Sequence, residues 1–209
     1  MNRLSIPGES LFVWSLIKPT HPTRVGEIKL LAGRQGLSFT YDAHWIDNGY
    51  PLSGDMPLQK SVIIPRDMRL GLGAINDAMP DRWGERAIRF LDKPKRAIPL
   101  DFLYYAGDRR FGSLGFSITP HRYEPHDKGP LPTLDSIESL QDLLHRIEHH
   151  QPLSAEEKLL ANSSKTMGGA HPKVLTQIDG REWITKFTRG SYVDLALIEH
   201  ASMVLASGA

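Results

Sequence analysis

The segment KVLTQIDGREWITKF, residues 173–187, decides how the C-terminal part of this chain folds. Two runs rich in β-branched residues flank Asp179-Gly180, and Asp-Gly between such runs is the strongest short-range signal of a β-hairpin. The run VDLALIEHASMVLA follows, and we expect a helix there with Ser191 as its N-cap. Because this helix is apolar on most faces, it is expected to pack against something large.

The sequence upstream of this hairpin alternates between strand and helix signals. Short β-branched and aromatic runs predict strands, with Gly33 and Gly36 supplying a hairpin turn; helix signals follow Asp81, Asp101 and Ser154 as expected N-caps, the last in a capping box with Glu157. Strands are expected over 11–17, 25–31, 37–42 and 111–119, helices after Asp81, over 101–106 (ended by Gly107), 136–150 and 154–162, an irregular stretch over 43–70 and a linker over 121–132. We therefore predict an α+β fold: an antiparallel β-rich N-terminal subdomain with short helices over 1–120, a linker and helical segment over 121–160, and a third part over 161–209.

Composition excludes several classes of protein. The 209 residues include 25 Lys+Arg and 24 Asp+Glu, so a net charge of +1 gives no global attraction to nucleic acid or membrane. The absence of cysteine excludes disulfides, zinc–thiolate sites, Fe–S clusters and cysteine nucleophiles. No apolar run approaches the roughly 18 residues of a membrane helix, and the N-terminus lacks the features of a signal peptide. We expect a cytoplasmic protein without membrane contact.

A glycine-rich stretch, SSKTMGGAHPK (163–173), precedes the predicted hairpin. Small residues let backbone N–H groups approach a polyanion, and a glycine-rich turn that feeds a hairpin is how protein kinases cover ATP phosphates. An ordinary Gly-Gly turn is the alternative.

Lys186 ends the second strand of the hairpin, and Glu199 lies within the helix that follows. In kinases a strand lysine contacts the phosphates and a glutamate of the next helix orients it. The alternative is an exposed strand lysine and a solvated glutamate, but Glu199 has Leu195, Ile198 and Met203 as neighbours on the helix.

These motifs together resemble the HipA-type serine/threonine protein kinases, the toxins of bacterial type II toxin–antitoxin pairs. The likeness extends to INDAMPDRWGERAIRF (75–90), YYAGDRRFGSLGF (104–116), and the N-terminal VGEIKL and LSFTYDAHWIDNGYPLSGDMPL. It implies that residues 161–209 are part of a kinase N-lobe with ATP and Mg²⁺ as cofactors. The implied nucleotide-binding residues are Thr166, Met167, Gly168, Gly169, Ala170, Lys186 and Glu199.

The resemblance also implies regulation and partners. In several members a serine of the glycine-rich loop is autophosphorylated; here the hydroxyls are Thr166 and, just upstream, Ser163 and Ser164. A phosphate there would place about two negative charges where ATP phosphates bind. The implied partner is a helix-turn-helix antitoxin of HipB type, through which alone DNA would be contacted.

The family's catalytic aspartates and asparagine have no counterpart in this sequence, so we expect no catalytic residues and no phosphotransfer by the chain alone, with weak or no binding of ATP. Three hypotheses stay open: the N-terminal part of a HipA-like kinase, a non-catalytic module that contacts an antitoxin or a kinase partner in trans, and an unrelated α+β domain.

Other candidate residues have structural interpretations. Trp83 and Phe111 are expected in the core, whereas Arg109 and Arg110 could contact nucleotide, partner or water. His145 and His149 share a helix face at the spacing of a metal site, but no third ligand accompanies them, which favours a solvated face.

Overall fold

The computed structural model describes residues 8–31, 36–67, 71–125, 129–165, 172–187 and 194–208. The chain forms two compact units: unit 1 comprises residues 1–80 and 88–128, and unit 2 comprises residues 81–87 and 129–209.

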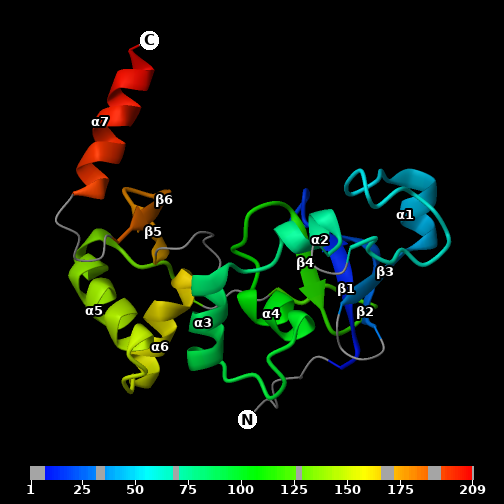
Figure 1. The fold of residues 1–209 in the computed structure, drawn as a ribbon, viewed down its shortest axis with the longest axis horizontal. Coiled ribbons are helices and arrows are strands. Elements are labelled where there is room, and N and C mark those ends of the chain that lie inside the picture. Colours follow the sequence, from blue (N-terminus) through cyan, green and yellow to red (C-terminus); the bar gives the residue numbers. More distant parts are fainter. Residues whose placement is uncertain are drawn as a thin grey trace. The chain divides into compact units, whose positions relative to one another are not determined.

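Figure 1 shows the elements in chain order. Unit 1 contains β1 (Ser10–Ser15), β2 (Thr23–Leu30), β3 (Leu37–Tyr41), α1 (Ala43–Asn48), α2 (Gly73–Asp77), α4 (Pro99–Ala106) and β4 (Leu114–Ser117). The unit boundary falls within α3 (Arg82–Leu91), and unit 2 continues with η1 (Leu134–Ser136), α5 (Ile137–Glu148), α6 (Ala155–Ala161), η2 (Asn162–Ser164), β5 (Lys173–Ile178), β6 (Arg181–Lys186) and α7 (Leu195–Ser207).

Unit 1 is built on an antiparallel sheet with the strand order β3-β2-β1-β4. The α+β prediction is confirmed, and the pairing of β2 with β3 confirms the expected hairpin. A bulge in β2 places Val25 as an extra residue opposite Val13 and Trp14 of β1. Gly26 follows this bulge, where an added Cβ would lie 2.3 Å from the Thr40 carbonyl oxygen, so the sheet requires glycine there.

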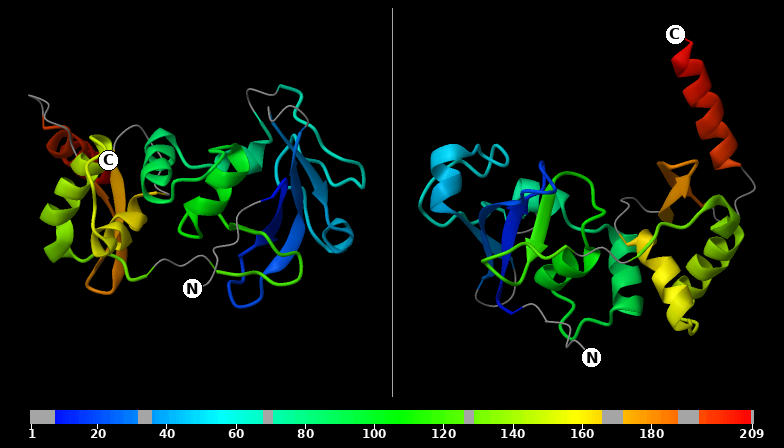
Figure 2. Two further views of the ribbon diagram at one scale, coloured as in Figure 1. Left: turned by 90° about the horizontal axis from the view of Figure 1, so that it is seen from below. Right: turned by 180° about the vertical axis from the view of Figure 1, so that it is seen from behind.

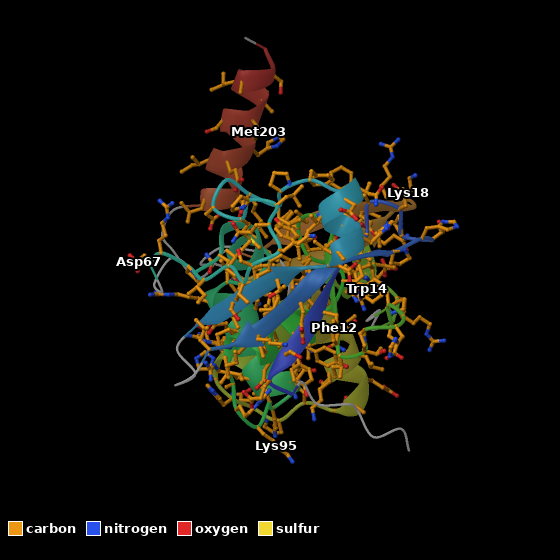
Figure 3. The ribbon with its side chains drawn as sticks, turned by 90° about the vertical axis from the view of Figure 1, so that its right-hand side faces the viewer. Phe12, Trp14, Lys18, Asp67, Lys95 and Met203 are labelled. Carbon is orange, nitrogen blue, oxygen red and sulfur yellow. The ribbon has the colours of Figure 1, made fainter. Side chains whose placement is uncertain are left out.

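The core of unit 1 lies on one face of this sheet. Alternate side chains of the strands contact helices α2 and α4, whose ribbons lie beside the sheet in Figures 1 and 2. This core includes Leu11, Val13, Ile28, Phe39, Ile75, Leu100, Leu103 and Phe116, all almost fully buried. On the opposite face the Trp14 indole donates to the Ser117 hydroxyl at 2.7 Å and contacts the Tyr123 ring. Figure 3 labels Phe12 and Trp14, which both lie on β1.

Two parts of unit 1 differ from the sequence-based expectations. The stretch 43–70, expected to be irregular, contains α1, because the Asp42 carboxylate accepts from the His44 backbone N–H and begins a helix. Asp101 was expected to cap α4, but the helix begins two residues earlier at Pro99. Asp101 instead lies buried in the first turn and pairs with Arg96 at 2.8 Å.

Arg110 and its neighbour Phe111 have opposite environments. Arg110 is buried, and its guanidinium donates to the carbonyl oxygens of Ala78, Leu103 and Gly107. Phe111 was expected in the core, yet its ring is 59% exposed. The expectation was wrong because the short segment that Arg110 anchors turns the next side chain outward.

Unit 2 contains the expected pair of amphipathic helices. Leu140, Leu143, Leu144 and Ile147 form the buried face of α5, and the Ser154–Glu157 capping box begins α6. Asp81 accepts from the Gly84 backbone N–H before α3, and Trp83 is buried, as predicted. His145 and His149 are exposed and stack on each other with ring centroids 4.1 Å apart.

The C-terminal segment is the hairpin β5–β6 followed by α7. Asp194 caps α7 by accepting from the Leu197 backbone N–H at 3.0 Å; the expected cap, Ser191, lies outside the described residues. The division of the chain at residues 120 and 160 stays a prediction. No helix in the described ranges combines the length and the hydropathy that a membrane span requires.

Candidate functional site

The β5–β6 hairpin fixes the position of the predicted phosphate-binding lysine. Asp179 and Gly180 both have positive φ, +50° and +73°, which is the conformation of a two-residue type I′ turn. Starting at the turn, each residue of β5 pairs with one residue of β6, from Ile178 with Arg181 onward. Lys173, the first residue of β5, therefore lies directly opposite Lys186, the last residue of β6. Directly opposite residues of an antiparallel pair project from the same face. Two lysines therefore emerge side by side at the open end of the hairpin.

Helix α7 supplies the acidic partner of this pair of lysines. Glu199 lies one turn after the Asp194 cap, and its carboxylate accepts a hydrogen bond from the Lys186 ammonium. Both side chains are about half exposed, 47% for Lys186 and 53% for Glu199. Lys186 and Glu199 are thirteen positions apart and belong to different elements, and the structure brings their side chains together. These are the two residues that the sequence analysis paired.

A groove of about 720 Å³ opens beside this ion pair between β6 and α7. Its volume lies within the roughly 300–1,000 Å³ of small-molecule sites. The two lysines and Glu199 form its polar part, and the remaining lining is mostly apolar. The lining residues are Lys173, Trp183, Ile184, Lys186, Phe187, Leu195, Ala196, Glu199, His200 and Met203. Such a lining can hold a flat apolar ring and direct a charged group toward the lysines.

The glycine-rich stretch directly precedes β5 in the sequence. Its predicted nucleotide-binding residues, Thr166, Met167, Gly168, Gly169 and Ala170, lie outside the described residues. The residue before β5, Pro172, is described, and its carbonyl oxygen accepts a hydrogen bond from the Phe187 backbone N–H at 3.2 Å. Pro172 is therefore held beside the end of β6.

The serines upstream of the loop are not presented to solvent. Ser163 and Ser164 are buried, and their hydroxyls donate to the carbonyl oxygens of Leu160 and Ala161 at 3.0 and 2.7 Å. A kinase would have to open η2 to reach either hydroxyl. Thr166, the third predicted phosphorylation site, lies outside the described residues.

Sequence reasoning did not assign a role to Lys173 beyond ending the loop. The signal that could have found it was the turn itself. A two-residue Asp-Gly turn pairs Ile178 with Arg181, and counting outward from that pair brings Lys173 opposite Lys186. The groove is also lined by Trp183, His200 and Met203. Their positions depend on packing between β6 and α7, which no local sequence pattern predicts.

Metal coordination finds little support in the described ranges. Glu199 is the acidic side chain among the residues that line the groove. No group of three or more His, Asp or Glu side chains in the part of the chain that the structure describes is arranged to hold a metal ion.

The comparison with known families matches part of the N-terminal half of the chain. The family model described as the HipA N-terminal domain matches residues 20–117, which run from the start of β2 to the end of β4. No curated protein matches the chain. The match covers 98 of the 209 residues and supports a HipA-type N-terminal region over residues 20–117.

Proposed function

We propose that this chain is the N-terminal part of a HipA-like serine/threonine protein kinase of a type II toxin–antitoxin pair, and that its groove binds the phosphates of ATP. The observation that carries the proposal is the Lys186–Glu199 ion pair at the edge of the groove. A lysine at the end of a hairpin, held by a glutamate from the next helix, is the phosphate clamp of protein kinases. The match of residues 20–117 to the HipA N-terminal domain favours that particular kinase family.

The proposed roles follow from charge and position. The Lys186 ammonium contacts the phosphates as a point charge, and Glu199 holds it toward the groove. The apolar part of the groove, formed by residues such as Ile184 and Met203, is suited to the base. ATP would bring Mg²⁺, which needs carboxylate ligands beyond Glu199, the acidic side chain among the described residues that line the groove. We therefore expect weak nucleotide binding and no phosphotransfer by this chain alone.

A titration of the full chain with ATP and Mg²⁺, followed by NMR or calorimetry, tests this proposal. A charged hydrogen bond to phosphate is worth about 1.5–3 kcal/mol, so Lys186→Ala should weaken binding roughly 10- to 100-fold. Glu199→Gln should weaken it less, because the lysine remains. Arg181→Ala is the matched control, since Arg181 is an exposed cation on the same strand at the opposite end of the hairpin.

The outcome depends on the contrast between these variants. Equal losses in Lys186→Ala and Arg181→Ala would reduce the effect to general charge attraction and contradict the proposed site. Adenosine as a competitor separates the two halves of the ligand: it should bind to both wild type and Lys186→Ala with the same affinity. Incorporation of labelled phosphate by the purified chain would contradict the expected lack of phosphotransfer.

The proposed partner is a helix-turn-helix antitoxin of HipB type, and DNA would be contacted only through it. The family match over unit 1 supports this proposal, because HipA-family proteins typically associate with such a partner. Co-purification with a small helix-turn-helix protein encoded beside this chain tests it. A non-catalytic role in trans, in which the chain binds the antitoxin or a kinase partner, predicts that this association survives Lys186→Ala.

A further inference from the structure

A short extended segment lies outside the four-stranded sheet of unit 1. Ile63 exchanges both backbone hydrogen bonds with Phe39 of β3, at 2.8 and 2.9 Å, and its side chain is buried in the core. Since β3 is an edge strand of the sheet, Ile63 lies against that edge and pairs with it through a single β-bridge. Residues 62–64 therefore line the edge of β3 at Phe39.

The outer edge of this segment has free hydrogen-bonding groups. In an antiparallel pair the residues on either side of a hydrogen-bonded residue direct their N–H and C=O groups away from the partner strand. Val62 and Ile64 hold these positions, and their backbone groups make no hydrogen bond to any residue within the described ranges. Each offers one donor and one acceptor along the edge, and Pro65, which lacks an N–H, ends the series.

The side chains at this edge are unusually apolar for a strand that faces solvent. Val62 and Ile64 are 55% and 52% exposed, and they project to the same side because Ile63 projects to the other. Proteins normally protect such edges with charge, proline or a covering loop, since an exposed apolar edge recruits another strand. Here the protection stops at Pro65, and two β-branched residues remain uncovered.

A groove of about 750 Å³ adjoins this edge. The stretch 54–59, with Asp55 and Pro57, forms one part of its lining, and the segment from Val62 to Asp67 forms the other. Figure 3 labels Asp67, one of the lining residues. Among the described residues that line the groove, Asp55 and Asp67 are acidic and Arg66 is basic, and the Asp55 carboxylate favours a basic residue in a bound peptide.

We propose that the edge of residues 62–64 and the adjoining groove bind an extended peptide segment of a partner protein by strand addition. The segment has apolar, preferably β-branched side chains at two alternate positions and a lysine or arginine that meets Asp55. Backbone hydrogen bonds to Val62 and Ile64 supply affinity, and the alternate side chains supply specificity. This surface belongs to unit 1, whereas the groove beside Lys186 belongs to unit 2, and the inference is independent of nucleotide binding.

Selection of random nonapeptides displayed on phage against the full chain tests this inference. Enriched peptides should carry alternate apolar residues and a basic residue. Val62→Pro removes one backbone donor and should weaken a selected peptide about tenfold or more. Val62→Lys, which places a charge on the same face, keeps the test valid if the proline variant fails to fold. Ile17→Ser is the matched control, because Ile17 is equally exposed, at 59%, and does not line the groove.

Hydrogen exchange distinguishes strand addition from a simple apolar contact. A bound peptide should protect the Val62 and Ile64 amides, which exchange fast in the free chain, whereas the Ile63 amide is already bonded. Peptides that bind without protecting these amides, or that bind Val62→Lys as tightly as wild type, would overturn the proposal. A dimer of the chain that Val62→Lys dissociates would assign the edge to a second copy instead and overturn it as well.

Discussion

Arg110 offers a sharp test of whether the motif YYAGDRRFG acts in binding or in folding. Its guanidinium donates at 2.9 Å to the Ala78 carbonyl oxygen, which follows α2, and at 2.6–2.8 Å to those of Leu103 and Gly107 at the end of α4. Its carbon Cζ lies 4.6 Å from the centre of the Phe116 ring on β4. One side chain therefore joins two helix ends to the sheet, and its guanidinium is committed to these buried acceptors.

Replacement of Arg110 should lower the free energy of unfolding, because its contacts are buried. Burial lowers the pKa of Arg110 to about 10, which is still well above neutral pH, so the group is charged in the folded protein at pH 7. Arg110→Met keeps much of the side-chain volume but leaves three buried carbonyl oxygens without their donor. Each loss costs about 1–3 kcal/mol, and relief of the buried charge offsets part of it. We expect a net loss of about 3–5 kcal/mol from the free energy of unfolding.

Urea denaturation followed by tryptophan fluorescence measures this loss. Arg110→Lys should fall between methionine and wild type, because one ammonium cannot reproduce the planar fork that reaches three acceptors. The neighbouring Arg109→Met is the matched control and should cost less than about 1 kcal/mol. If Arg110→Met keeps wild-type stability yet loses partner or nucleotide binding, the structural interpretation of Arg110 is refuted.

Three further substitutions test other parts of the fold. Gly26→Ala should destabilise the chain by about 1–3 kcal/mol in thermal or urea unfolding, because its Cβ would overlap the Thr40 carbonyl oxygen and the Phe39 ring of β3; Gly54→Ala, with nothing within 4 Å of its Cβ, should not. The pKa of Asp55 lies below 3.8, chiefly because its carboxylate accepts a hydrogen bond from the Ser53 hydroxyl, so its contribution is present above that pH and is lost as the pH falls through the lowered folded value. Asp55→Asn should remove that part of the acid dependence of stability, and an unchanged acid limb would contradict it. Ser154→Ala breaks the capping box with Glu157 and should cost about 1 kcal/mol, measured by urea unfolding; an unchanged midpoint would show that the cap contributes nothing.

The elements that the sequence predicted correctly are those set by local chemistry. The Asp-Gly turn, the Ser154 capping box and the Gly107 helix end each depend on residues within a few positions of one another. Helix α1 escaped prediction because only six residues form it, too few for an apolar period. Asp101 was misassigned because a carboxylate near a helix start reads as a cap, whereas its partner Arg96 lies outside the helix and cannot be seen from helical spacing.

The candidate site divides along the same line. The pairing of Lys186 with Glu199 was reached through resemblance to a kinase, and the ion pair in the structure agrees with it. The place of Lys173 follows from hairpin register alone and was available without any resemblance. The apolar lining of the groove could not be predicted from hairpin register, because it forms where β6 lies beside α7. The edge at residues 62–64 was equally hidden, since it depends on a single pair of hydrogen bonds to β3.

The Lys186–Glu199 ion pair is expected to add little to the stability of the fold, which favours the proposed role in binding an anion. An exposed ion pair contributes about 0–1 kcal/mol, and both members of this pair are about half exposed. Lys173 directly opposite Lys186 opposes even that gain, because like charges facing each other across an antiparallel pair are destabilising. A hairpin built for stability alone would place an apolar or acidic residue at position 173. In the proposed site, an anion such as a phosphate group would relieve the repulsion between the facing ammonium groups of Lys173 and Lys186. The prediction that follows is specific: Lys173→Glu should raise the stability of the isolated chain slightly while weakening its binding of ATP, whereas a variant that lowered both would show that Lys173 serves the fold.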